Sequence, residues 1–506
     1  MTIVVVATAA LLLLGIVAYR KVRFHRLQQF SAWPQPKPSL IYGHLKVFHT
    51  AVMEGNQKRH TDMVLLQMRK SLGNPPLFIL DLRPVQPPLA VICRHEIAEQ
   101  ISKGSRDFPY SLPKSPTFSH LKPLLGRGSM ITAYGEEWKR LRKRFSPGFA
   151  PLHLMGLLPC VLNKAWTFLQ TLDRYAARVE HFPLEELCAN LTMDIIGEVA
   201  MGEDLHAQLG NDKQTELAQL YRKLSSILSM SLEGIDHLSP RVMDETQDQL
   251  KTFLFDGYDT TSILLQWLFY EISRTPRVLA AIKRELDDIF GADSSPEAVR
   301  DMLLSGQGPE LVRKMSYISA VIKETLRLHP PSGTARYTPR GSDFYVTLPD
   351  GSSLCLDEAV LYSCSTIIHR DPNVYNMSDE FQPERWLSNR DTSFLANTST
   401  HRTPVSAWRA FERGPRDCLG QGLAMLEARV ILACTVRRYK FEKVGLGELK
   451  RDSKDRLILN PKGQYEVESE IYNTMQVLAT PVDGMQMKVQ LVPGASPLSG
   501  TIHRER

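Results

Sequence analysis

The chain contains several stretches in which apolar residues recur at helical spacing. Leu250–Trp267 is a long apolar stretch of this kind, and it predicts a buried helix although its centre is polar. Tyr134–Arg144 is strongly basic and ends at a Ser-Pro-Gly turn, and Ala320–His329 also has helical spacing. Past position 418 the same spacing predicts another buried helix, through Leu419, Leu423, Leu426, Val430 and Cys434.

Short apolar runs beside turn residues predict strands. Phe78–Leu82 and Leu89–Cys93 are separated by prolines and are expected to pair. Pro349-Asp350-Gly351 lies between Phe344–Leu348 and Ser353–Leu356, which predicts a hairpin.

A second hairpin is predicted near the end of the sequence. Val482-Asp483-Gly484 supplies the turn between Met475–Thr480 and Met485–Leu491. Residues 494–506 are expected to form a loose tail.

The N-terminal residues have the composition of a membrane anchor. Thr2–Tyr19 is eighteen residues without a charge, about the minimum for a bilayer span. Basic residues follow at once, which places the downstream chain on the cytosolic side. A cleaved signal peptide is the competing interpretation, but neither a charged leading region nor a small-residue cleavage site is evident. Ser31–Pro38 is proline-rich and predicts a stiff, extended tether.

Composition limits the other classes of function. The 506 residues are 43% hydrophobic and 23% charged, so the chain can bury a large core. Its seven cysteines show no zinc spacing, which favours a reducing compartment without disulfides. The net charge of +6 is mild for this length and gives no reason to expect nucleic acid as a partner.

The candidate chemistry centres on Phe411–Gly420, with the sequence FERGPRDCLG. Cys418 has glycines on both sides, which allow a tight turn and the close approach of a flat ligand. Arg416 offers a positive charge, Phe411 could cover the sulfur, and the following helix would favour a thiolate through its N-terminal amides. The alternative is a structural cysteine beside a glycine-rich turn.

The full pattern F-x-x-G-x-R-x-C-x-G resembles the haem-binding loop of the cytochrome P450 family. The resemblance implies haem b with Cys418 as the axial thiolate ligand, and a thiolate in that position favours O–O cleavage. Phe411, Gly414, Arg416 and Gly420 would surround the haem. The implied fold is mainly α with a small β-rich lobe, preceded by one transmembrane helix. The expected boundaries are an anchor at 1–19, a tether at 20–38, a haem-thiolate domain at 39–493 and the tail at 494–506.

Two positions outside the loop are expected to hold the haem carboxylates. Trp138 and Arg142 are four residues apart and therefore share a helix face. By resemblance this pair binds a haem propionate, whereas W-x-x-x-R taken alone would indicate a solvated basic face. Arg336 is a second propionate ligand by resemblance, and an ordinary surface arginine is the equal alternative.

The polar centre of Leu250–Trp267 resembles the distal helix of the family. That resemblance assigns oxygen activation to Thr260 and proton delivery to Asp259. The alternative for the threonine is a hydrogen bond back to the carbonyl four residues earlier. Asp256 departs from the family, which usually has a small residue there. Its carboxylate could crowd the oxygen-binding groove, engage a cationic or hydroxylated substrate, or perturb the proton supply.

Two further motifs resemble structural parts of the family. Glu324 and Arg327 form E-x-x-R, and Arg385 lies in FQPERW, so the three predict a buried ion network behind the haem loop. Met485 is expected near the tip of a hairpin that reaches the substrate pocket.

Fewer residues separate Gly202 from Asp256 than in a typical member, which indicates a shortened roof over the substrate pocket. Either the roof is naturally reduced, or the sequence comes from a gene model that has lost an exon.

Taken together, the resemblance implies a monooxygenase that inserts one oxygen atom from O2 into an apolar organic substrate. Its electrons would come from NADPH–cytochrome P450 reductase, with cytochrome b5 as an additional donor. The motifs look most like fungal microsomal members, many of which modify polyketides or other secondary metabolites. The expected location is the endoplasmic reticulum membrane with the catalytic domain in the cytosol. Two alternatives stay open: a reductase-independent haem-thiolate isomerase or dehydratase, and a catalytically impaired haem-binding relative.

Overall fold

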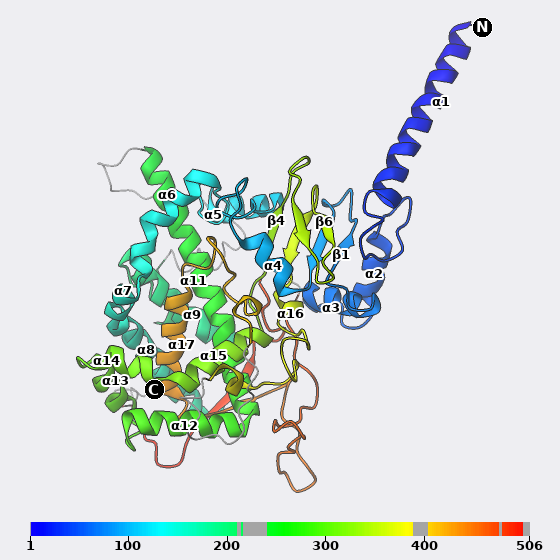
Figure 1. The fold of residues 1–506 in the computed structure, drawn as a ribbon. Coiled ribbons are helices and arrows are strands. Elements are labelled where there is room, and N and C mark those ends of the chain that lie inside the picture. The colour runs from blue at the N-terminus through cyan, green and yellow to red at the C-terminus, as the bar shows by residue number, and fades with distance from the viewer. Residues whose placement is uncertain (1, 210–213, 216–239, 388–402, 475–477, 499–506) are drawn as a thin grey trace. The chain divides into compact units, whose positions relative to one another are not determined.

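The computed structural model describes residues 2–209, 214–215, 240–387, 403–474 and 478–498. Contacts within the chain divide it into two compact units, and Figure 1 shows their elements as a ribbon. The first unit comprises Met1–Pro116, Gly333–Asp371 and Arg413–Pro415. The second unit comprises Thr117–Ser332, Pro372–Glu412 and Arg416–Arg506.

The first unit contains a four-stranded sheet in the order β1-β2-β7-β4. Its strands are β1 (Leu77–Leu80), β2 (Leu89–Ile92), β7 (Val360–Ser363) and β4 (Thr334–Tyr337). β1 and β2 pair antiparallel, with Phe78 opposite Val91, so the strand pair predicted from the sequence is confirmed. The other predicted hairpin is also confirmed, as β5 (Tyr345–Thr347) and β6 (Ser353–Cys355).

Helices of the first unit bury their apolar residues against the sheet. Two apolar clusters pack around the sheet, one of which includes Ile97 and Ile101 of α4 and the other Val64 and Leu65 of α3. The bounds of these helices are α2 (Leu45–Met53), α3 (Thr61–Ser71), α4 (His95–Ser102) and α16 (Ser365–Ile368).

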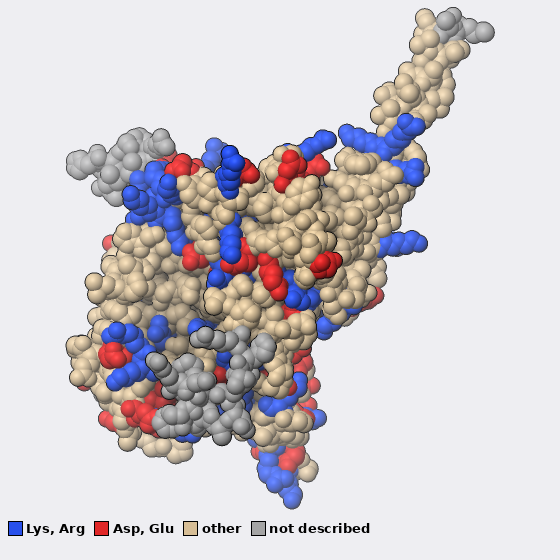
Figure 2. All heavy atoms as spheres, in the orientation of Figure 1, with Lys and Arg blue, Asp and Glu red and all other residues tan. Residues whose placement is uncertain are grey.

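The N-terminal helix α1 (Thr2–Arg23) continues into a π-helical turn, Phe24–Gln28. Residues Ile3–Gln28 are long and apolar enough to cross a membrane, and none of the apolar window is buried against the rest of the chain. In Figure 2 the helix is a tan column with blue Lys and Arg side chains at its base. An N-terminal helix of this kind fits a single-pass anchor, although a signal sequence would have the same composition.

The segment after the helix is folded against the first unit. Arg26 donates to Asp81 at 2.8 Å, and Trp33 is buried among apolar residues of the sheet cluster. The predicted tether is thus attached at Trp33 rather than fully extended, because the indole removes apolar area from water.

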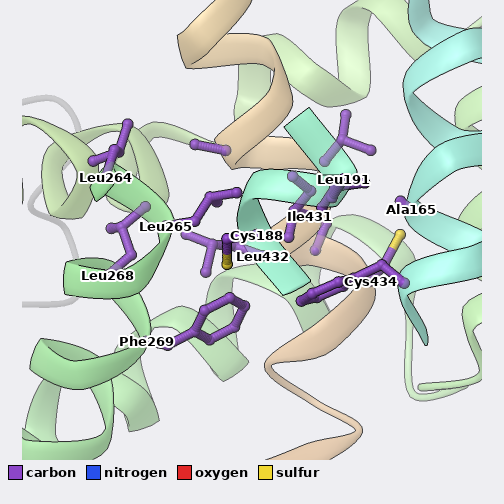
Figure 3. Packing of buried hydrophobic residues seen from close by; sticks show 14 of the residues in the cluster. Ala165, Cys188, Leu191, Leu264, Leu265, Leu268, Phe269, Ile431, Leu432 and Cys434 are labelled. Carbon is purple, nitrogen blue, oxygen red and sulfur yellow. The ribbon is translucent and has the colours of Figure 1, made fainter. Parts of the chain in front are cut away.

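The second unit contains most of the helices. Its helices are α5 (Lys122–Leu125), α6 (Gly135–Phe145), α7 (Pro151–Gly156), α8 (Leu158–Arg178), α9 (Leu184–Met201), α11 (Pro240–Arg274), α12 (Pro276–Phe290), α13 (Pro296–Leu304), α14 (Gly308–Lys314), α15 (Ser316–Leu328) and α17 (Gln421–Thr435). Figure 3 shows where α8, α9, α11 and α17 meet in the largest apolar cluster. Leu191, Leu265 and Ile431 lie in this cluster, and all three are fully buried. The helices predicted over Tyr134–Arg144 and Ala320–His329 are confirmed as α6 and α15.

Helix α11 is the long apolar helix predicted from Leu250–Trp267, and it extends further at both ends. Its centre packs closely on α9. The Thr192 hydroxyl donates to the Tyr258 carbonyl at 2.7 Å, and a Cβ on Gly257 would lie 2.6 Å from Ile196. Glycine at 257 therefore sets the separation of the two helices at the polar segment of α11.

The second predicted hairpin is wrong as a local pair. β9 (Gln486–Leu491) pairs with β3 (His181–Pro183) and β8 (Tyr439–Lys443), both antiparallel. Val482 instead bonds back to Tyr472, and residues 475–477 of the predicted partner strand lie outside the described residues. The Asp-Gly turn is present, but the backbone of β9 pairs with β3 and β8, which lie far from it in the sequence.

The segment between Gly202 and Asp256 that indicated a shortened roof lies largely outside the described residues. Only its ends, through Leu209, at 214–215 and from Pro240 onward, have a described backbone. The two explanations for its length therefore stay as they were.

Candidate functional site

Cys418 lies in the loop that leads into α17, two residues before the N-cap residue Gly420. Its backbone N–H donates to the carbonyl of Phe411 at 2.8 Å, which closes the loop on itself. All seven cysteines are free, and Cys418 is the one whose side chain is exposed. Cys188 and Cys434 on buried helices are enclosed, while Cys160 and Cys355 are half-buried, so Cys418 is the most exposed of the seven cysteines.

The electrostatics around the Cys418 thiol differ from the expectation. Burial of the sulfur by surrounding protein, together with the carboxylate of Asp256, raises the pKa of Cys418 to about 11. The backbone N–H of Gly420 and the charge of Arg142 act in the opposite direction but are outweighed. Cys418 as a residue is exposed, but protein atoms surround its thiol, and the protein alone does not stabilise a thiolate there. A coordinated metal would, because it deprotonates a thiol outright.

Two arginines of the second unit fix the residues that directly precede Cys418. Arg142 of α6 donates to the carbonyl and the carboxylate of Asp417, each at 2.6 Å. Arg416 donates to the carbonyls of Ala133, Met130 and Ile131 at 2.8–3.1 Å.

Trp138 completes this group. The guanidinium of Arg416 lies 5.0 Å from the centroid of the Trp138 ring, and both side chains are buried. Trp138, Arg142 and Arg416 are thus brought together beside Cys418, as the motifs predicted. Sequence reasoning missed the partner Asp417, whose only signal was its position between Arg416 and the cysteine.

Phe411 packs on the core side of the loop. Its ring meets Trp408 edge-on at 5.8 Å between centroids, and it borders the large apolar cluster. This contact anchors the start of the loop and limits how far the Phe411–Cys418 turn can open.

The two glycines of the loop have different structural requirements. Gly414 has φ +81°, and a Cβ there would lie 2.3 Å from the carbonyl oxygen of Ser102. Gly420 has φ −80°, and the nearest atom to its Cβ would be the Cys418 sulfur at 3.9 Å. Only Gly414 is required by the backbone and its neighbours, and no close contact among the described residues requires glycine at 420.

We expect Gly414→Ala to lower the free energy of unfolding by about 2 kcal/mol or more, since it combines a left-handed backbone with a steric overlap. Gly420→Ala is the matched control and should leave that free energy nearly unchanged. Denaturant unfolding of the two variants measures the difference. Equal stability would contradict the assignment of backbone strain to position 414.

Arg336 belongs to the first unit. It lies on β4, is 1% exposed, and contacts the carbonyl of Leu112 at 3.5 Å. The interpretation as an ordinary surface arginine is therefore wrong, because the residue is buried. A buried guanidinium needs polar partners. Its role as a propionate ligand stays a prediction.

The centre of α11 carries the predicted oxygen-activation residues. The Thr260 hydroxyl donates to the carbonyl of Asp256 at 2.6 Å, which is the back-bonded arrangement considered as the alternative. Burial raises the pKa of Asp259 to about 6. Asp256 is exposed, and its negative charge contributes to the raised pKa of Cys418.

The network around Glu324 is formed as predicted. Arg327 binds both oxygens of Glu324 at 2.8 and 2.9 Å, and Arg385 binds one of them at 3.2 Å. Trp386 donates to the same carboxylate at 2.9 Å. The guanidinium carbons of Arg327 and Arg385 lie 5.1 and 5.8 Å from the centroid of the Tyr375 ring. Burial alone would raise the pKa of Glu324, but the two arginines outweigh it and hold that pKa below its ordinary value.

Met485 does not lie where a substrate could reach it. Its side chain is fully buried in the large apolar cluster, and its carbonyl accepts from Leu184 at 3.2 Å. The expectation of a substrate contact placed this residue at a hairpin tip. The actual turn is folded against the start of α9, which encloses the methionine.

The basic helix α6 is partly neutralised. Arg140 and Arg144 both pair with Glu245 of α11, and Lys139 lies 3.5 Å from Glu136. These basic side chains are all exposed, and the pairing with carboxylates offsets part of the positive charge of the helix.

The residues around Cys418 fit an iron porphyrin. Among the described residues, no group of three or more His, Cys, Asp or Glu could hold a metal ion. A haem needs only one ligand from the protein, and the Cys418 thiol would supply it. Arg142 and Arg416 carry positive charge that suits the carboxylates of such a ligand, but Arg142 is paired with Asp417 and Arg416 with three backbone carbonyls, so binding would require an exchange of these partners.

Comparison with known proteins agrees with the site. The family pattern described as Cytochrome P450 matches residues 34–244 and 241–468. The chain is 30% identical over 497 residues to cytochrome P450 monooxygenase acrF of Aspergillus aculeatus, covering 84% of this chain and 96% of that protein. It is 28% identical to cytochrome P450 monooxygenase polC of Polytolypa hystricis, covering 83% and 84%. It is 26% identical to cytochrome P450 4V2 of Rattus norvegicus, covering 81% and 85%. The matched ranges include each element from α6 to α17.

Proposed function

The chain belongs to the cytochrome P450 family, and on that premise we propose a haem-thiolate monooxygenase anchored in the endoplasmic reticulum membrane and reduced by NADPH–cytochrome P450 reductase. The observation that carries the proposal is the exposed residue Cys418 at the start of a buried helix, directly after two residues that Arg142 and Arg416 hold in place. Cytochrome b5 is a second candidate electron donor. The N-terminal helix supports the anchor, and the basic residues after it support a cytosolic catalytic body.

Each residue has a defined task in this proposal. Cys418 supplies the thiolate ligand, and Trp138, Arg142 and Arg416 bind the haem carboxylates. Bound haem would supply the chemistry that activates O2. Phe411 and Gly420 would border the haem. Gly414 and Arg336 are assigned to haem binding on the family resemblance alone.

Asp259 and Thr260 are proposed to deliver protons during oxygen activation. A carboxyl whose pKa is raised to about 6 by burial can both hold and release a proton near neutral pH. The Thr260 hydroxyl donates to the Asp256 carbonyl. If the hydroxyl turned away from that bond, it could pass its own proton onward and take a replacement proton that comes from Asp259.

We expect Thr260→Ala to uncouple electron use from product formation. The variant should consume NADPH but release hydrogen peroxide, with product per NADPH lower by about tenfold or more, since a positioned proton donor contributes about 10²–10⁴-fold. Thr260→Ser keeps the hydroxyl and is the matched control. Product and peroxide are measured together, and unchanged coupling in Thr260→Ala would remove the assignment.

The proposed substrate is an apolar organic molecule, such as a fungal polyketide or another secondary metabolite. The two fungal relatives named as monooxygenases support this class. Asp256 is exposed on the segment of α11 that faces the cysteine loop, and we propose that it contacts a hydroxyl or amine of the substrate.

Reconstitution with and without the reductase tests the proposal. Membranes that carry the full chain should oxidise their substrate only with both NADPH and reductase present. Turnover without either would favour the isomerase or dehydratase, and haem uptake without any turnover would favour the impaired relative.

A further inference from the structure

A short segment before α6, residues 128–133, is hydrogen-bonded both to α11 and to Arg416. The segment, α11 and Arg416 all belong to the second unit. Its carbonyls on the Arg416 side are described above, whereas its contacts with α11 have no role in the assignments made so far.

Gln249 of α11 binds the backbone of this segment much as a neighbouring strand would. Its Oε1 accepts from the N–H of Met130 at 2.9 Å, and its Nε2 donates to the carbonyl of Gly128 at 2.6 Å. Gln249 is 1% exposed, so water has little access to replace either bond. The side-chain amide is therefore committed to holding residues 128–130 against the helix.

Two more side chains of α11 support the same segment. Oδ2 of Asp248 accepts from the N–H of Gly128 at 2.8 Å, and the hydroxyl of Thr252 donates to Oγ of Ser129 at 2.8 Å. Ser129 is fully buried. About one turn of α11 thus fixes the first half of the segment.

The second half of the segment holds Arg416. The guanidinium donates to the carbonyls of Met130, Ile131 and Ala133. Met130 carries both connections, because Gln249 binds its N–H and Arg416 binds its carbonyl. A continuous line of hydrogen bonds therefore runs from α11 through Met130 to the arginine of the cysteine loop.

The orientation of Arg416 depends on how firmly these carbonyls are held. A guanidinium has five N–H donors, so it can bind a carboxylate with some of them while others stay on the segment. Ordering a long side chain at the moment of binding costs affinity, and carbonyls that are fixed in advance remove part of that cost. The bonds from Gln249 therefore bear on any anion that Arg416 binds.

We propose that Gln249 is a positioning residue for haem: by holding residues 128–133 it keeps Arg416 oriented for the haem carboxylates. The inference rests on the proposed role of Arg416 as a ligand of those carboxylates. Gln249 acts through Met130 and Arg416, not by contact with the haem.

The test measures the rate of haem loss from the full-length, haem-loaded chain to excess apomyoglobin. Gln249→Met keeps the length of the side chain but removes both hydrogen bonds, and we expect haem loss to become about tenfold faster. Gln266→Met is the matched control, because Gln266 is also buried on α11 but donates within its own helix, to Ser262 at 3.2 Å. This variant should lose haem at the wild-type rate.

A second haem separates positioning from general loosening of the fold. When both haem carboxylates are converted to methyl esters, Arg416 has no charged partner on the ligand. Gln249→Met should lose this diester no faster than the wild type does. In an Arg416→Met background, Gln249→Met should likewise add nothing to the loss of ordinary haem, since the two changes act on one contact.

Amide hydrogen exchange checks the first link without measuring haem. Exchange over residues 128–133 should be faster in Gln249→Met than in the wild type and unchanged in Gln266→Met. Thr252→Val removes a single hydroxyl contact with the same segment. Should Gln249→Met fail to fold, Thr252→Val carries the same tests with a smaller expected increase in haem loss, about threefold.

The outcomes separate this inference from the proposed function. If Arg416→Met speeds haem loss and Gln249→Met does not, the role of Arg416 stands and the inference is wrong. If Arg416→Met has no effect, its proposed role as a carboxylate ligand is itself overturned. Equal acceleration for haem and its diester, or unchanged exchange over residues 128–133, would show that Gln249 does not act through Arg416 and would also overturn the inference.

Discussion

Cys418→Ser abolishes the thiolate spectrum and the monooxygenase activity: this is the largest effect expected of any single change in the chain. A serine hydroxyl does not ionise near neutral pH and is a poor ligand for haem iron, so the electron donation that favours O–O cleavage is lost. The reduced carbon monoxide complex should no longer show the red-shifted Soret band of thiolate-ligated haem, and product formation should fall to background.

Cys355→Ser is the control for the loss of a thiol as such. Cys355 is half-buried on β6 of the first unit, away from the loop in sequence. This variant should keep both the spectrum and the activity. A thiolate spectrum that survived in Cys418→Ser would mean that another cysteine ligates the iron, and the site would have to be reassigned.

Glu324→Gln should give the largest loss of stability. The carboxylate is completely buried and accepts from Arg327, Arg385, Trp386 and the backbone of Gln382. An amide of the same size removes the negative charge and leaves two arginines close together. Breaking a buried pair from one side costs about 3–5 kcal/mol, and we expect the free energy of unfolding to fall by that amount.

Glu310→Gln provides the control, because Glu310 and Arg313 have the same i, i+3 spacing on a helix but are exposed. Such a surface pair contributes about 0.5 kcal/mol or less. Denaturant unfolding of both variants compares the two environments directly. Similar losses in the two would show that the Glu324 network is not a buried charge cluster in solution.

The Glu324 network also predicts a pH dependence. Because the folded pKa of Glu324 lies below its ordinary 4.5, its stabilising contribution is present above pH 4.5 and is lost as the pH falls through the folded pKa. The melting temperature of the wild type should therefore drop more steeply on acidification than that of Glu324→Gln.

Local patterns in the sequence predicted the parts of the fold that local physics controls. The apolar spacing of α11 and α15, the turn between β5 and β6, and the pairing of β1 with β2 all depend on residues close in the chain. The buried Glu324–Arg327–Arg385 network was also predicted, from two motifs of the family taken together.

The remaining contacts depend on residues far apart in the chain. β9 was expected to form a hairpin, but its edges match β3 and β8, which no turn signal reveals. Arg142 meets Asp417 across 275 positions, and Arg336 is buried although its sequence neighbourhood is polar. The Thr260 hydroxyl bonds within its own helix, and periodicity alone could not choose between that and a free hydroxyl.

The position of β9 between β3 and β8 constrains the order in which the protein can fold during synthesis. The three-stranded sheet joins residues 181–183 to residues 486–491, so it cannot close until Leu491 has left the ribosome. Pairing across about three hundred residues carries a large loop-closure cost and forms late. The strand β3 that leads into α9 therefore lacks its partner during most of translation. A chain stopped before position 486 should stay bound to chaperones.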